Sequence, residues 1–179
     1  LPILNIAEIY EKFDRIGCLT FATIDNGMPQ TRIAHLLAQD EDGLYFQTMH
    51  TKPFYAQLVQ TGKVALCGMY PKTSVSHDAD GMSYFAPGYT IRLTGEVREI
   101  PFDRLKEKAA VNPAFSPCVQ DIEKYPAMTT FCIHKAWGEI FDYDFEMQHR
   151  DHKLLRTGFC FGGAEVPFRG MRITESCIS

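Results

Sequence analysis

The sequence predicts a mainly β protein, a barrel or sandwich of about six antiparallel strands with two or three small helices. Several segments are rich in β-branched and aromatic residues and alternate in polarity, most cleanly Tyr89 to Ile100. Short turn signals join neighbouring segments, above all Asn26-Gly27, which suits a type I′ hairpin because both central residues need a positive φ. Consecutive antiparallel strands hide their edges by closing on themselves, and this favours a barrel or a sandwich.

The first 50 residues are predicted to hold one helix and three strands. Asn5 to Ile16 has apolar residues at helical spacing, with Asn5 as the N-cap and Gly17 as the stop. The segments Cys18 to Asp25 and Gln30 to Gln39 flank the hairpin signal and should pair. Leu44 to Thr48 follows a second polar turn and is the third strand.

A second helix is predicted from Pro53 to the stop at Gly62, with Thr51 as its N-cap. Its inward side chains are expected to be Phe54, Leu58 and Val59. The largely apolar segment Lys63 to Tyr70 then predicts a strand that is buried on both faces.

The rest of the chain is less regular. Pro71 to Gly88 is predicted to be a loop with a short strand near its end, and Pro101 to Ala110 a short helix. Val111 to Ala127 is a Pro-punctuated connection with one helical turn, and Met128 to Phe145 a last strand or hairpin. We therefore divide the chain into one domain, residues 1–145, and an extended C-terminal tail, residues 146–179.

Composition narrows the function class. A chain of 179 residues fits one domain, and a net charge of −4 argues against a nucleic-acid partner. There is no apolar run of about 18 residues and no signal-peptide pattern at the N-terminus, so no membrane partner is expected. The six cysteines are scattered without a C-x-x-C pair, which favours reduced thiols and a cytoplasmic location.

A candidate phosphate site lies where the third strand leads into the second helix. Arg32, Thr51 and Lys52 offer a guanidinium, a hydroxyl and an ammonium group, and the helix from Pro53 adds backbone N–H groups. If the second and third strands are neighbours, these donors converge. The alternative is that Arg32 is a solvated strand residue and that Thr-Lys-Pro is an ordinary helix start.

Further motifs occur in a characteristic order. They are Phe21-Ala22-Thr23-Ile24-Asp25, Gly27, Pro29, Arg32, Gly43-Leu44-Tyr45-Phe46-Gln47-Thr48, Lys52, Leu58, Lys63-Val64-Ala65-Leu66 and Lys135-Ala136-Trp137-Gly138 leading to Phe141. In this order and spacing the chain resembles the pyridoxamine 5′-phosphate oxidase-related, FMN-binding split-barrel family over Leu4 to Phe145.

The resemblance implies a six-stranded split β-barrel and a homodimer with two FMN sites at its interface. Carried over residue by residue, the FMN contacts fall on Arg32, Ile33, Ala34, His35, Gln47, Thr48, Thr51 and Lys52. Arg32 and Lys52 would hold the phosphate, and the strand residues would flank the isoalloxazine ring.

The chain departs from true vitamin B6 oxidases in two places. Leu37 stands where their motif closes with a Lys, and their Trp-containing Arg-Leu-x-Pro signature is absent. The chain is more similar to the general branch with nitroimidazole-resistance-type reductases. This implies an FMN-dependent oxidoreductase, flavin-reductase-like, acting on a small molecule or an electron carrier, with no obligatory catalytic residue. The alternatives are a non-catalytic flavin or haem binder or redox sensor, and an electron carrier whose chain continues past Ser179 into an iron–sulfur segment.

Three histidines have weaker functional interpretations. His149 and His152 could bind a metal or lie in a solvated turn. His35 could exchange a proton beside the flavin or simply pack in its strand. Cys67 and Cys132 are expected to be small buried side chains.

Overall fold

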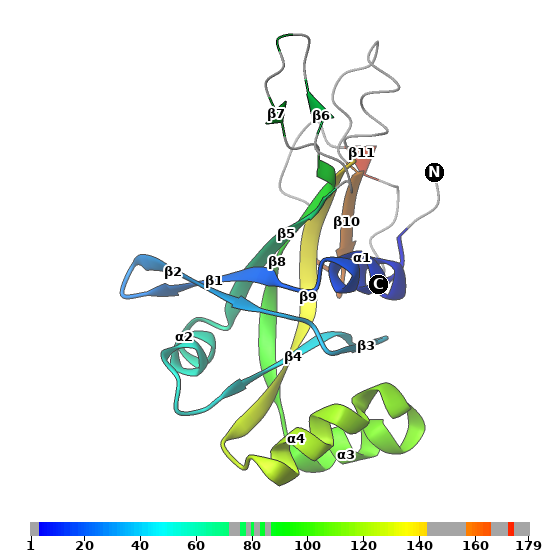
Figure 1. The fold of residues 1–179 in the computed structure, drawn as a ribbon. Helices are drawn as coiled ribbons and strands as arrows, with labels where there is room; N and C mark the ends of the chain where they lie inside the picture. Colours follow the sequence, from blue (N-terminus) through cyan, green and yellow to red (C-terminus); the bar gives the residue numbers. More distant parts are fainter. Residues whose placement is uncertain are drawn as a thin grey trace.

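The computed structural model describes residues 4–71, 76–77, 80, 83–84, 87–142, 157–165 and 172–173. One nine-stranded sheet dominates them, and small helices flank it (Figure 1). Its strands are β1 (Leu19–Asp25), β2 (Met28–Ala34), β3 (Ala38–Asp40), β4 (Gly43–Met49), β5 (Lys63–Pro71), β8 (Pro87–Ile100), β9 (Met128–Asp142), β10 (Thr157–Phe161) and β11 (Arg172–Ile173). The helices are α1 (Ile6–Ile16), α2 (Pro53–Thr61), α3 (Phe102–Val111) and α4 (Ser116–Lys124), with a 3₁₀ turn at Pro113–Phe115. The short strands β6 (Ser76–His77) and β7 (Ser83–Tyr84) pair only with each other in the part of the chain that is described.

The mainly β class is confirmed, but the predicted number of six strands is too low. The predicted return strand from Gln30 to Gln39 is divided into β2 and β3, because β2 pairs with β1 whereas β3 pairs with β4. The predicted tail adds β10, which pairs with β9, and β11, which pairs parallel to β10. All other pairs in the sheet are antiparallel.

The long strand β9 organises the sheet. It pairs with β8 along one side, and on its other side with β4 through its first half and with β10 through its second half. The hydrogen-bonded order then continues from β8 through β5 and β1 to the edge strand β2. This order sets β2, β4 and α2 around one space (Figure 1).

The helix α1 and the turn between β1 and β2 form as their local sequence signals predict. Asn5 caps α1 in a reciprocal capping box with Glu8, and Gly17 ends the helix with a φ of 76°. The turn between β1 and β2 has the positive φ angles that a type I′ turn needs, 47° at Asn26 and 82° at Gly27. These two elements need no information from distant residues.

The start of α2 differs from the prediction. Lys52, not Thr51, is the N-cap, with extended backbone angles (φ −92°, ψ 148°) and no side-chain cap. Pro53 explains the difference, because a proline keeps the residue before it out of the helical region. Phe54 and Leu58 are buried as predicted, whereas Val59 is 58% exposed.

The outer face of β5 is not covered as predicted. Val64 and Leu66 are buried on its inner face, but Cys67 is exposed. The small or moderately apolar residues of the outer positions made the strand look apolar on both sides. The burial of Cys132 is confirmed.

The Pro-punctuated connection after α3 is more helical than predicted. It forms the 3₁₀ turn and the nine-residue helix α4, because prolines occupy first-turn positions, where no N–H is needed. A small core joins α3 and α4 to the sheet through Tyr45, Leu105, Phe115 and Cys118.

The main core fills the sheet's inner side with aromatic rings. Phe46 stacks on Phe54 and on Phe131, with ring centroids 5.8 Å apart in each pair, and meets Phe21 at 5.0 Å. These rings hold β1, β4, β9 and α2 together beside the cavity described below.

Four cysteines have free thiols as expected, namely Cys18, Cys67, Cys118 and Cys132. Cys160 on β10 is disulfide-bonded, so the expectation of reduced thiols is wrong for this residue. None of the helices in the described ranges is both long and apolar enough to span a membrane. The predicted domain boundary at residue 145 and the pair His149 and His152 lie outside the described residues.

Candidate functional site

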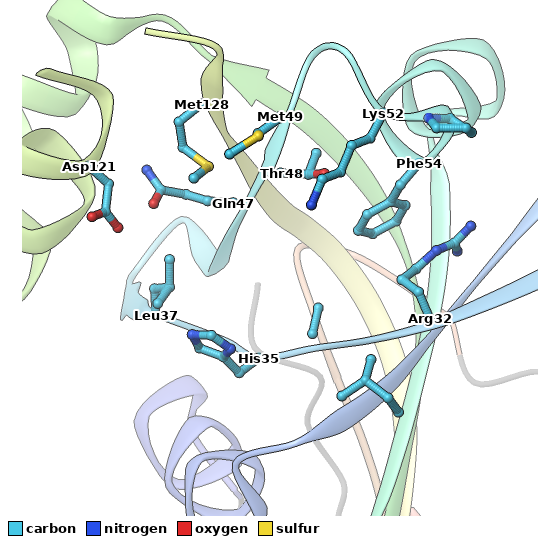
Figure 2. Close-up of a pocket in the computed structure, with 13 residues that line it drawn as sticks. Arg32, His35, Leu37, Gln47, Thr48, Met49, Lys52, Phe54, Asp121 and Met128 are labelled. Atoms are coloured by element: carbon cyan, nitrogen blue, oxygen red, sulfur yellow. The ribbon is translucent and has the colours of Figure 1, made fainter. Parts of the chain in front are cut away.

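A cavity of about 550 Å³ opens between β2, β4, the start of α2 and the end of α4 (Figure 2). Its walls are formed by Arg32, Ile33, Ala34, His35, Leu37, Gln47, Thr48, Met49, Lys52, Pro53, Phe54, Asp121 and Met128. The division between β2 and β3 makes room for it, since β2 pairs with β1 and not with β4.

Seven of the eight residues predicted for the site line this cavity. Arg32, Ile33, Ala34 and His35 come from β2 and the segment after it, and Gln47 and Thr48 from β4. Lys52 comes from the start of α2. Thr51 does not line the cavity and is exposed in the turn before the helix.

Lys52 provides an accessible positive charge at one end of the cavity. The residue is exposed, and Figure 2 shows its amine pointing into the cavity beside Thr48 and Phe54. As the N-cap of α2 it stands at the positive end of the helix. This end therefore suits an anionic group.

Arg32 lies at the same end of the cavity, but its guanidinium already makes hydrogen bonds within the protein. Its Nη1 donates to Thr23 Oγ1 at 2.7 Å, and its Nη2 donates to Gln57 Oε1 at 2.6 Å. The guanidinium also lies over the Phe54 ring, 4.3 Å from its centroid. Partial burial lowers the pKa of Arg32, since desolvation penalises the charged form. Arg32 thus supports the fold as well as the cavity wall.

Gln47 lies at the other end of the cavity, between β4 and α4. Its Nε2 donates to the Cys118 carbonyl oxygen at 2.9 Å and to Thr130 Oγ1 at 3.0 Å. Its Oε1 is buried and has no hydrogen-bond partner in the described part of the chain. Buried acceptors are normally paired, so this oxygen, which solvent does not reach, is an exception.

Sequence reasoning missed six residues of the cavity wall, namely Leu37, Met49, Pro53, Phe54, Asp121 and Met128. Met49 and Pro53 directly adjoin predicted residues, and Leu37 and Phe54 lie two positions from one, so these four could have been included by proximity. Asp121 lies on α4 and Met128 at the start of β9. Both elements meet β4 only through contacts between segments that are distant in sequence. No local pattern in the sequence marks them.

Comparison with known proteins supports the fold. No protein-family model and no curated protein matches the sequence. Among solved structures, a NimC/NimA family protein from Clostridium acetobutylicum is 23% identical, with a TM-score of 0.54 over 75% of this chain and 83% of that chain. A pyridoxamine 5′-phosphate oxidase-related, FMN-binding protein from Nostoc punctiforme is 18% identical, with a TM-score of 0.51 over 74% and 78%.

The chain has the fold of these pyridoxamine 5′-phosphate oxidase-like proteins. The same fold is seen in the haem storage protein HutZ from Vibrio cholerae, at 15% identity and a TM-score of 0.52 over 73% of this chain and 90% of that chain. The family resemblance drawn from the motifs is therefore confirmed at the level of fold. Because pyridoxamine 5′-phosphate oxidase-like neighbours include both flavin and haem proteins, the fold by itself does not choose between these ligands.

Proposed function

We propose that this protein is an FMN-dependent oxidoreductase that acts on a small molecule or an electron carrier. One observation carries the proposal: seven of the eight residues of the motif-based FMN site line one cavity. A mainly β fold shared with FMN-binding proteins supports it.

The donor chemistry of the cavity fits FMN. The phosphate would lie at the Lys52 end, where an ammonium group and a helix N-terminus favour a doubly charged anion. Ile33, Ala34 and Met49 offer apolar surface for a planar ring. Gln47 and Thr48 add polar contacts from β4.

The cofactor, when bound, supplies the hydride or electron transfer. The chain's own residues bind and orient it: Lys52 neutralises the phosphate, and Arg32 braces the wall between β2 and α2. His35 lines the cavity, where its imidazole can donate or accept a hydrogen bond. No residue of the chain needs to act as an obligatory acid or base.

We also infer the finer architecture that the family resemblance implies. Following the pairs from β2 through β1, β5, β8, β9 and β4 leads to β3, and residues 35–37 join β3 back to β2. Counting β2 and β3 as one interrupted strand, this path is the six-stranded split barrel, and β10 and β11 extend the sheet outside it.

A second copy of the chain is the partner that we propose for the exposed hairpin. On β1 and β2, Ile24 and Ile33 share the outer face and are 46% and 65% exposed. β2 is also an edge strand, which exposes backbone groups to solvent. Since Ile33 also lines the cavity, a second copy placed here would close the site.

Fluorescence titration of FMN into the purified protein tests the proposed function. We expect saturable quenching, and Lys52→Ala should weaken the affinity about tenfold or more, because a hydrogen bond to a charged group contributes about 1.5–3 kcal/mol. Lys63→Ala is the matched control, because Lys63 is an exposed lysine that does not line the cavity. Equal FMN affinity in both variants would contradict the phosphate assignment.

The second candidate function is haem binding without catalysis. The similarity to HutZ favours it, and His35 is a cavity residue that could serve as an iron ligand. Titration with hemin distinguishes the two. A Soret band that shifts in His35→Ala, together with no FMN binding, would replace the flavin proposal with this one.

A further inference from the structure

The two ends of the cavity differ in charge. The end at α2 carries the cationic side chains Lys52 and Arg32, whereas the end at α4 carries the Asp121 carboxylate. Figure 2 shows Asp121 and Gln47 on the side of the cavity away from Arg32 and Lys52. An FMN molecule bound with its phosphate at α2 does not explain why a carboxylate lines the other end of the cavity.

The orientation of the Gln47 amide is fixed by its partner. The Cys118 carbonyl oxygen can only accept a hydrogen bond, so the amide group that faces it at 2.9 Å must be the NH₂. The oxygen of Gln47 is therefore the atom that is left buried without a partner in the described chain.

Asp121 is placed beside Gln47 by the same contact. It follows Cys118 by three residues on α4, so the two residues lie on one face of the helix. Its side chain lines the cavity, and its carboxylate has no hydrogen-bond or ion-pair partner among the residues that the structure describes. A carboxylate without a described partner thus lines this end of the cavity, beside the Gln47 amide.

We propose that this α4 end is a substrate subsite for a cationic nitrogen group, such as an amine or amidine, on a small planar molecule. The proposal rests on the proposed function, because the molecule would bind beside FMN. Leu37 and Met128 provide apolar walls for its carbon skeleton.

Calorimetric titration with benzamidine and with benzamide tests the subsite. The two probes share a ring, but only benzamidine is cationic. The wild-type protein should bind benzamidine about tenfold or more tightly than benzamide, and Asp121→Asn should remove most of this preference. Glu123→Gln is the matched control, because it removes one negative charge from an exposed position of α4 outside the cavity.

Each titration is made with and without FMN, after the FMN affinity of each variant has been measured. If FMN does not bind but benzamidine binding depends on Asp121, the proposed function fails and the subsite is supported. If the wild-type protein has no preference for benzamidine, or Asp121→Asn retains it, the subsite is overturned. A tenfold loss of FMN affinity in Asp121→Asn without any benzamidine preference also overturns it, because the carboxylate then serves the cofactor.

Discussion

Arg32 and Lys52 bring the same charge to the cavity but have different surroundings. Arg32 bonds to Thr23 and Gln57, which are only 4% and 5% exposed, whereas Lys52 is exposed at the start of α2. A ligand can use Lys52 without breaking any contact that holds β1 to α2. The two residues should therefore separate cofactor binding from stability.

Arg32→Ala should lower the free energy of unfolding by about 1–3 kcal/mol, because it leaves buried polar atoms of Thr23 and Gln57 without their shared donor. Lys52→Ala should change it by no more than about 0.5 kcal/mol, as exposed substitutions usually do. Urea denaturation of both variants without ligand measures the difference. Equal stability of the two variants would show that the Arg32 contacts contribute little.

Among single residues, the sequence predicts the two cationic residues of the cavity, but neither their partners nor Asp121. Arg32 and Lys52 are predicted because their positions match the order and spacing of the family motifs. Gln57 is a polar residue on a short helix, and only the packing of α2 against β1 buries it. Asp121 belongs to the cavity only because α4 packs against β4.

One lysine of the helix α3 forms ion pairs at the turn between β3 and β4. Lys108 Nζ lies 2.6 Å from Asp40 Oδ2 and 2.7 Å from Asp42 Oδ2, and its side chain is only 12% exposed. Tyr45 donates its hydroxyl to the other oxygen of Asp40 at 2.8 Å. This cluster fixes α3, which shares a small core with α4, the helix that carries Asp121.

Lys108→Met should lower the free energy of unfolding by about 2–3 kcal/mol, because it leaves the carboxylate of Asp40 partly buried without a counter-charge. Lys106→Met is the control on the same helix, since Lys106 pairs with the exposed Asp103 and should matter by about 0.5 kcal/mol or less. Thermal or urea unfolding measures both. A loss of similar size in both variants would contradict a special role for Lys108.

The same cluster should contribute to acid sensitivity. The hydrogen bond from Lys108 is the main cause that lowers the pKa of Asp42. A carboxyl whose pKa is lowered by folding stabilises the protein above its ordinary pKa, and this contribution is lost as the pH falls below about 4. Unfolding measured from pH 7 to pH 3 should show a shallower loss in Asp42→Asn than in the wild-type protein. An unchanged slope would contradict this coupling.

Elements defined by local signals were predicted well, and elements defined by distant pairing were not. The cap of α1 and the hairpin turn depend on neighbours in sequence. β2 and β3 are separate strands because β3 pairs with β4. The strand β10 forms by pairing with the second half of β9. Neither of these strand pairings is specified by the residues of the segment itself.

For the whole molecule, the exposed hairpin face predicts assembly. Ile24→Asp should convert a dimer to monomers, because it places a charge in the proposed interface and does not touch the cavity. Val111→Asp on α3 is the control, at a residue that is 85% exposed and far from the hairpin in sequence. Size-exclusion chromatography with light scattering gives the masses. A monomeric wild-type protein, or a dimeric Ile24→Asp variant, would contradict the proposed partner.

The overall class of the molecule was predicted from patterning and turn chemistry, and the motif order located most of the cavity. The ligand is a matter of site chemistry, and similar folds do not determine it. The central claim is therefore the flavin chemistry of the cavity.

The most direct measurement is an absorption spectrum of the purified protein with FMN, recorded anaerobically before and after addition of NADH or NADPH. We predict a protein-bound flavin band that bleaches with one of the two nucleotides. A protein that retains no flavin, or a bound flavin that neither nucleotide reduces, would contradict the proposed flavin-reductase-like activity.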